Sequence, residues 1–337
     1  MSQENTREIR KTTIGGQALI EGLMMIGPDK KAMAVRNAEG EIILEFLTGG
    51  KISKAEKIPF IRGPVRVFKQ LVTGTKALMR SAEIAESGES TEADNADSTK
   101  STTTEISESR ETSEQSRRKK SFSEKYPNFS LYVSAIVSIF FSVLLFMLLP
   151  GLIVDGIKLL FKIDLSSRLV SLALTLFEGI IRVGIFIFYL WLVSKMDDIK
   201  RVWQYHGSEH KTIACYEARM PLTVENIRGF SRFHPRCGTS FMFLIMIVSI
   251  IILSFIGWHS RLINLIVRLL LLPVIAGITY EIIRLVGRYD NVLTRAISKP
   301  GMAMQKLTTA EPDDSMIEVA IAAMEAVIPE QEGSDDW

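Results

Sequence analysis

Four long runs of apolar residues alternate with strongly polar stretches along this chain of 337 residues. They cover residues 131–154, 169–193, 241–258 and 262–286. Each run has roughly the 20 residues that a helix needs to cross the hydrocarbon core of a bilayer, and soluble core helices rarely stay so apolar over that length. The pattern predicts an α-helical polytopic membrane protein with four transmembrane helices, whose membrane domain covers 128–286.

Lysines and arginines are concentrated in alternate connections between these runs. Many precede the first run, lie between the second and third, and follow the fourth, whereas the connection between the third and fourth has only Arg261. Because cytoplasmic connections carry the excess of basic residues, we expect both termini and the histidine-rich loop 195–239 to be cytoplasmic. The expected location is the plasma membrane, as a multi-pass protein in contact with the lipid bilayer.

Ahead of the membrane domain, residues 12–85 have the pattern of a small α+β cytoplasmic module. Residues 15–28 are dense in glycine, which predicts tight turns or close backbone approach. Residues 32–36 and 42–46 flank a turn and predict a β-hairpin. Residues 65–85 show helical spacing of apolar residues among basic ones. That helix either packs on its own domain or lies on anionic lipid.

The remaining segments are the two chain ends, a polar linker and a C-terminal helical segment. We expect a flexible N-terminus over 1–11 and a disordered polar linker over 86–127, because such a composition buries too little surface to offset chain entropy. Residues 287–329 predict a C-terminal cytoplasmic helical segment, in which the run Asp313-Asp314-Ser315 caps an amphipathic helix. A flexible tail is expected over 330–337.

Composition and charge narrow the class of protein further. Net charge is +2, which gives no specific nucleic-acid signal. The only cysteines are Cys215 and Cys237, which excludes a disulfide framework and fits a reducing compartment or metal ligation.

The candidate chemistry lies within the predicted loop 195–239. His206, Glu209 and His210 form H-x-x-E-H, the spacing of inverted zinc-peptidase motifs. On a helix, residues four apart share a face, so both imidazoles could hold one ion. With His234 as a third ligand, an open fourth position suits a zinc hydrolase in which Glu209 is the general base.

Other assignments of these residues stay open. If Cys237 is a fourth ligand, the site is closed and the zinc is structural. Inverted motifs take a distant carboxylate as third ligand, for which Glu217 and Asp290 are candidates. Gly207 and the serine after it weaken the helix on which the ligand argument depends. If no metal binds, His206 could instead cap a helix or meet lipid phosphate.

Two charges lie inside the second apolar run. Glu178 and Arg182 are four residues apart and can pair on one helix face. A polar transport pathway should show more such positions, so we favour a structural ion pair. Arg268 in the fourth run either joins this pair or reaches outward to the interface.

Several motifs follow one another in a recognisable order. They are the glycine-rich opening, the Phe-Ile-Arg-Gly-Pro turn, the histidine cluster, the Phe-His-Pro-Arg-Cys-Gly-Thr-Ser segment and the Lys-Leu-Thr-Thr-Ala-Glu-Pro-Asp-Asp tail, at 15–28, 60–64, 206–210, 233–240 and 306–314. Together they resemble the YqhQ family of uncharacterised bacterial membrane proteins, which are labelled metal-dependent enzymes. The resemblance covers nearly the whole chain except 86–120, and it implies a divalent metal cofactor.

Three functional hypotheses follow. The first is a membrane-embedded, zinc-dependent hydrolase with its site at the cytoplasmic face. The second is a noncatalytic scaffold or assembly factor that docks a protein partner, with a structural zinc or no metal. The third is a transporter, which is weakest because no internal repeat is visible, although a homo-oligomer would supply further spans. We also expect Gln17 and Glu21 of the glycine-rich segment to lie close to His206.

Overall fold

A computed structural model describes residues 10–47, 53–87, 133, 137–164, 167–256, 261–331 and 333–336. Residues 1–9 of the predicted flexible N-terminus lie outside the described residues, as does most of the predicted linker, from residue 88 to 127. The chain divides into two compact units, one formed by 1–88 with 150–337 and the other by 89–149.

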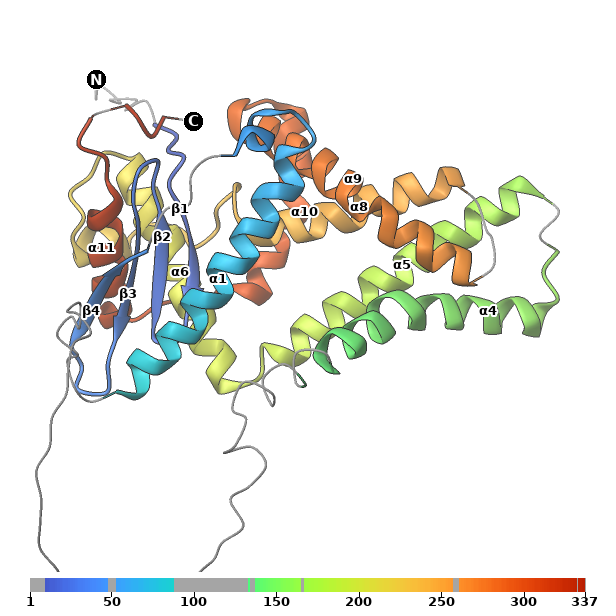
Figure 1. Cartoon of the computed structure of the whole chain (residues 1–337), viewed down its shortest axis with the longest axis horizontal. Helices are drawn as coiled ribbons and strands as arrows, with labels where there is room; N and C mark the ends of the chain where they lie inside the picture. The colour runs from blue at the N-terminus through green and yellow to red at the C-terminus, as the bar shows by residue number, and fades with distance from the viewer. Residues whose placement is uncertain are drawn as a thin grey trace, which may run out of the picture. The chain divides into compact units, whose positions relative to one another are not determined.

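A four-stranded antiparallel sheet in the order β1-β2-β3-β4 forms the N-terminal part of the first unit (Figure 1). Its strands are Gly15–Leu19, Gly22–Ile26, Lys31–Arg36 and Ile42–Phe46. The predicted hairpin of β3 and β4 is confirmed, with Arg36 opposite Ile42. The glycine-rich segment forms a second hairpin, of β1 and β2, whose tight turn places Glu21 at a φ of 49°.

The two faces of this sheet pack against different helices. Alternate side chains of a strand point to opposite faces, so Leu23 and Met25 join one core while Met24 lies in the other. The first core is completed by α6 (Asp197–Glu217) and α11 (Asp314–Val327), and the second by α1 (Arg62–Glu86), which follows the short 3₁₀ turn η1 (Lys54–Lys57). The α+β module placed at 12–85 therefore shares its core with helices far along the chain.

The connection between the second and third apolar runs differs from the expected loop. Most of 195–239 is helical, as α6 and the short α7 (Val224–Arg228). The predicted C-terminal helix is confirmed as α11, where the Asp313 carboxylate accepts the Met316 amide N–H at 3.0 Å. The reason for the difference is packing: α6 buries Tyr205 and Ile213 against the sheet and α11.

A flexible tail was expected over 330–337, of which the structure describes residues 330, 331 and 333–336. Residues 333–336 lie against the N-terminal segment, where Thr12 and Asp336 form an isolated antiparallel bridge. Asp335 is fully buried and accepts hydrogen bonds from the Thr12 hydroxyl at 2.6 Å and the Tyr216 hydroxyl at 3.2 Å. Arg10 pairs with the same carboxylate. These bonds satisfy a buried charge and fix the two ends together.

In the part of the chain that the structure describes, four helices are long and apolar enough to cross a membrane, as the apolar runs predicted. They cover Val137–Phe161, Arg168–Val193, Gly238–Ile256 and Leu262–Arg288. The first contains the π-helical turn η2 (Leu144–Leu148) and α4 (Leu149–Phe161), so it ends seven residues beyond the predicted run. The others are α5 (Arg168–Val193), α8 (Gly238–Ile256) and α9 (Arg261–Arg288).

Within the first unit α8 packs against α5, α9 and α10 (Val292–Thr308). The predicted pair inside α5 forms: the Arg182 Nη2 donates to Glu178 at 2.6 Å. Arg268 of α9 joins it, with its Nη2 2.7 Å from the second carboxylate oxygen. Glu178 is 1% exposed, so the three charges tie α5 to α9 inside the helix bundle.

Candidate metal centre

The H-x-x-E-H residues lie in the middle of α6, so the helix on which the ligand argument depends is present. Gly207 has a tertiary role there, because a Cβ at this position would lie 2.1 Å from the Ala310 carbonyl oxygen. Because glycine has no Cβ, the chain after α10 can cross α6 closely at this position. The hydroxyl of Ser208 donates to the Tyr205 carbonyl at 2.7 Å and is thereby satisfied within the helix.

Both imidazoles on α6 are oriented by backbone carbonyls. His206 Nδ1 lies 2.8 Å from the Thr308 carbonyl, and His210 Nδ1 lies 2.6 Å from the carbonyl of Arg232. A carbonyl only accepts, so each Nδ1 carries a proton, and in the neutral form of each ring the Nε2 lone pair is left for another partner. This is the arrangement by which outer hydrogen bonds fix the tautomer of metal-binding histidines.

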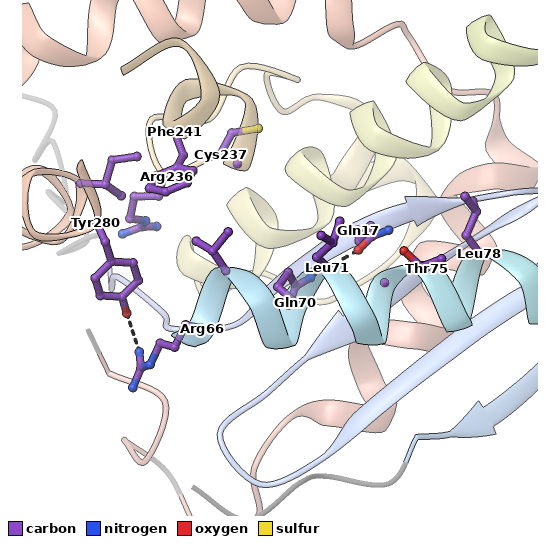
Figure 2. A pocket seen from close by; sticks show the side chains of 14 residues that line it. Gln17, Arg66, Gln70, Leu71, Thr75, Leu78, Arg236, Cys237, Phe241 and Tyr280 are labelled. Atoms are coloured by element: carbon purple, nitrogen blue, oxygen red, sulfur yellow. Dashed lines mark hydrogen bonds between the residues drawn. The ribbon is translucent and has the colours of Figure 1, made fainter. Parts of the chain in front are cut away.

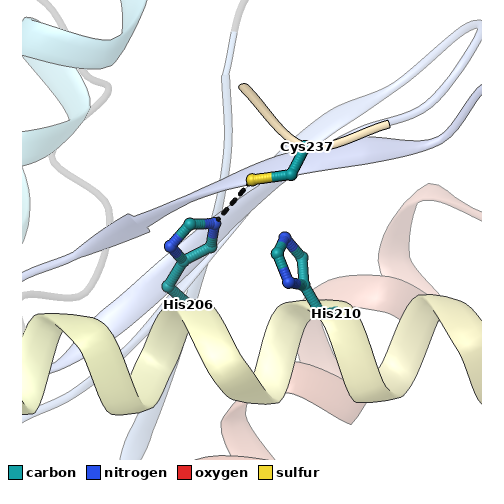
Figure 3. Close-up of side chains that lie close together, drawn as sticks. All are labelled: His206, His210 and Cys237. Atoms are coloured by element: carbon teal, nitrogen blue, oxygen red, sulfur yellow. Dashed lines mark hydrogen bonds between the residues drawn. The ribbon is translucent and has the colours of Figure 1, made fainter. Parts of the chain in front are cut away.

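Cys237, just before α8, completes a three-residue cluster with these histidines (Figure 3). Its Sγ lies 3.2 Å from His206 Nε2, and the ring centroids of His206 and His210 are 4.4 Å apart. One ligand atom from each of the three lies within 4.8 Å of the others, and all three residues are buried. Two imidazole nitrogens and a thiolate form a donor set that zinc prefers, so the residues present fit the metal.

Glu209 lies beside the cluster with half of its carboxylate satisfied. Oε1 accepts the Gly16 amide N–H at 2.9 Å, whereas the buried Oε2 has no hydrogen-bond partner among the described residues. Burial raises the pKa of this carboxyl above its usual value, against the opposing effect of His206 and His210. A buried oxygen without a partner is costly unless something else in the cavity interacts with it.

Thiol and imidazole ionisation are coupled in this cluster. Burial opposes the thiolate, but His210 and His206 outweigh it and hold the pKa of Cys237 well below its usual value. Burial likewise opposes the imidazolium of His206, yet the thiolate raises its pKa to about 9. Thiolate is the form that binds metal, and a cation at this position stabilises it whether that cation is imidazolium or a metal ion.

His234 lies next to the cluster but faces other groups. Its ring centroid is 5.6 Å from that of His210, while its Nε2 is 3.6 Å from Glu217 and 3.2 Å from Arg236. Burial lowers the pKa of His234. The residues whose ligand atoms converge are therefore His206, His210 and Cys237, and the predicted ligation by His234 stays a prediction.

The glycine-rich segment packs against α6, as expected. Gly16 contacts Glu209 directly, and Gln17 lines the same cavity of about 540 Å³ as His206. Glu21 lies further along β1–β2, where it pairs with Arg201 and lies 3.4 Å from the Tyr205 hydroxyl. This cavity lies between β1, α6 and the start of α8.

Three other predicted candidates lie away from this cavity. Asp290 is exposed and pairs with Arg295 at 2.6 Å, and it lines a different cavity. Glu178 and Arg182 belong to the ion cluster of α5 and do not line the cavity of the histidines. The structure thus separates these residues from the metal candidates.

Sequence reasoning missed the supporting residues that come from distant segments. Thr308 and Arg232 act through their backbone carbonyls, which leave no side-chain signal. Gln305 holds the loop before Cys237, since its Oε1 accepts the His234 amide at 2.8 Å and its Nε2 donates to the His234 carbonyl at 2.7 Å. The one available signal was the tail motif 306–314, which includes Thr308.

Comparison with known proteins adds the family context. The family described as "Protein of unknown function (DUF1385)" matches residues 58–330. The protein named "Uncharacterized protein YqhQ" from Bacillus subtilis (strain 168) is 32% identical over 318 residues, which cover 93% of this chain and 92% of that protein. No solved structure matches.

Proposed function

The chain belongs to the YqhQ family, which the DUF1385 description covers, and from that premise we propose that it is an integral membrane, zinc-dependent hydrolase. The observation that carries this proposal is the convergence of two imidazoles, each oriented through Nδ1, on the Cys237 sulfur beside the unpartnered Oε2 of Glu209.

The membrane assignment rests on the four apolar helices and the distribution of basic residues. The basic connection that contains α6 would face the cytoplasm together with both termini. The cavity with His206 lies at the start of α8, where Gly238 and Thr239 line it. The site would then lie at the cytoplasmic surface of the plasma membrane.

His206, His210 and Cys237 would hold the zinc ion. When bound, zinc with three protein ligands supplies a Lewis acid that activates water and polarises the bond to be broken. A closed structural site would require a fourth protein ligand, for which the sequence predicted His234. Because His234 Nε2 lies against Glu217 and Arg236, the arrangement favours an open site.

Glu209 would transfer the proton. Its raised pKa suits an acid–base group that works near neutral pH. Oε2 would take a proton from the attacking water and give it to the leaving oxygen or nitrogen, while Oε1 stays held by the Gly16 amide. Hydrolysis then adds the hydroxyl of water to the substrate's electrophilic atom and the hydrogen to the released group. Glycine at position 16 permits this close approach of the backbone to Glu209, because a Cβ there would lie 3.0 Å from the Glu209 carboxyl carbon.

Zinc content measured by mass spectrometry on detergent-purified protein tests the proposal. We expect about one zinc per chain in the wild type and in Glu209→Gln, and nearly none in His210→Ala or Cys237→Ala. Cys215→Ala is the matched control, because Cys215 is equally buried yet its thiol lies near the carbonyls of Met220 and Pro221. Unchanged zinc in both ligand variants would overturn the proposed centre.

Activity separates a catalytic from a structural zinc. Screening the zinc-loaded protein with panels of ester, amide and phosphodiester substrates should reveal a hydrolysis that Glu209→Gln slows about 10²–10⁴-fold with zinc retained. A structural zinc in a scaffold predicts instead that ligand variants unfold and that Glu209→Gln behaves as the wild type.

A further inference from the structure

A second cavity, of about 530 Å³, lies beside the candidate metal centre (Figure 2). Its walls are mainly apolar, with Val67, Leu71 and Leu78 of α1 on one side and Phe241 of α8 and Ile283 of α9 on the other. We name this cavity the α1 groove. Its volume lies in the range of pockets that bind small ligands.

The α1 groove adjoins the cavity of the metal centre. Five residues line both cavities: Gln17, Gln70, Arg236, Cys237 and Gly238. Cys237 is the proposed metal ligand, so a molecule held in the groove would have one end beside the reacting atoms. Gln70 Nε2 lies 3.3 Å from Gln17 Oε1. This amide pair lies where the apolar walls of the groove meet the more polar walls of the metal-centre cavity.

α1 is fixed to a part of α9 that lies within the candidate membrane span. A Cβ on Gly63 would be 3.0 Å from the Gly277 Cα, and Arg62 pairs with Glu281. Gly277 is eleven residues before the end of the helix at Arg288, which corresponds to about 16 Å along its axis. The N-terminal end of α1 and the groove beside it therefore lie alongside the half of this candidate span that ends at Arg288.

The outer face of α1 is itself apolar. Phe68 is 66% exposed and Leu71 is 65% exposed, and Val72 and Met79 are also exposed. A helix with such a face beside basic residues is typical of the lipid interface. Arg66, which donates to the Tyr280 hydroxyl, adds positive charge at the rim of the groove, where Arg236, which pairs with Glu217, also lies. An apolar groove with basic residues beside its polar end is complementary to an anionic lipid.

We propose that the α1 groove receives an acyl chain of an anionic membrane phospholipid and that such a lipid is the substrate of the metal centre. The identification as substrate rests on the proposed hydrolase, whereas lipid binding does not. The chain would lie between α1 and the ends of α8 and α9, with the ester or phosphate groups directed past Gln17 and Arg236 towards Cys237. Hydrolysis of one ester bond consumes one water and releases an acid and an alcohol.

Photocrosslinking in nanodiscs tests this placement. The probe is phosphatidylglycerol with a diazirine at the end of one acyl chain, in discs of phosphatidylglycerol and phosphatidylethanolamine. We expect crosslinks to peptides containing Leu71, Phe241 and Ile283. Leu71→Trp fills the groove and should reduce the crosslinks to Phe241 and Ile283 roughly ten-fold. Phe68→Trp is the matched control, because Phe68 is equally exposed on α1 but does not line the groove.

Zinc content of the same samples separates the two proposals. Crosslinks that Leu71→Trp removes, in protein that lacks zinc, would support the groove and overturn the metal centre. Crosslinks that Leu71→Trp leaves unchanged, in protein that holds zinc, would overturn the groove and leave the metal centre standing. Protein-to-protein crosslinks in the groove would also overturn the lipid assignment, in favour of a second copy of the chain.

Discussion

Replacing Gly207 with alanine inserts a methyl group into the contact between α6 and the chain that follows α10. The new Cβ would lie 2.1 Å from the Ala310 carbonyl oxygen, so the crossing segment must move by roughly 1 Å to restore ordinary contact. That segment carries the Thr308 carbonyl, which orients His206, and the Ala310 amide, which donates to the Trp203 carbonyl at 2.8 Å.

The expected size of the effect follows from opposing contributions. Alanine favours a helix interior over glycine by about 1 kcal/mol. Overpacking costs about 1–3 kcal/mol, and each of the two weakened hydrogen bonds contributes about 0.5–1.5 kcal/mol. The net loss in free energy of unfolding is therefore about 1–5 kcal/mol. Loss of the bond that orients His206 should also lower zinc affinity about 10–100-fold.

Thermal unfolding of the metal-free protein in detergent measures the first effect, and zinc titration against a competing chelator measures the second. Gly184→Ala in α5 is the control, because a Cβ there meets no described atom within 4 Å and the variant should be as stable as the wild type or more so. If Gly207→Ala unfolded at the wild-type temperature and bound zinc as tightly, the proposed role of the crossing segment would be wrong.

Two further predictions concern the protein outside the metal centre. Asp335→Ala should lower the free energy of unfolding by about 1–3 kcal/mol, because it removes the buried acceptor of the Thr12 and Tyr216 hydroxyls. Arg10 keeps its second partner, Asp336. Asp336→Ala, at a carboxylate that is 59% exposed, should change thermal unfolding far less. Burial opposes the ionisation of Asp313, but bonds from Ser315 and the Met316 amide outweigh it and lower the pKa. Its ionised form therefore stabilises the fold above the usual aspartate pKa of about 3.9, and this contribution is lost as the pH falls through the lowered pKa. Unfolding curves over this pH range should show the advantage of wild type over Asp313→Asn shrinking with acidification, and a constant difference would contradict the argument.

Local patterns in the sequence were sufficient for most elements of the fold. The apolar runs predicted the four long helices, and the Asn-Ala-Glu-Gly turn predicted the hairpin of β3 and β4. The run Asp313-Asp314-Ser315 marked the start of α11, and the structure identifies Asp313 as the cap. These signals act over a few residues, where hydrophobic spacing and capping determine the outcome.

Long-range contacts were not predictable in the same way. Gly207 weakens a helix by local propensity, yet α6 forms because the sheet and α11 bury its side chains. Cys237 was one of several possible ligands, and only the fold brings its sulfur to His206 while directing His234 towards Glu217. The burial of Asp335 depends on residues more than 300 positions away, which no pattern along one segment could reveal.

X-ray absorption at the zinc edge, on zinc-loaded protein purified in detergent, tests the central claim most directly. A centre built from His206, His210 and Cys237 predicts one sulfur at about 2.3 Å and nitrogen or oxygen ligands at about 2.0–2.1 Å. The sulfur contribution should disappear in Cys237→Ala and persist in Cys215→Ala. A zinc spectrum without sulfur, or a protein that binds no zinc, would contradict the account.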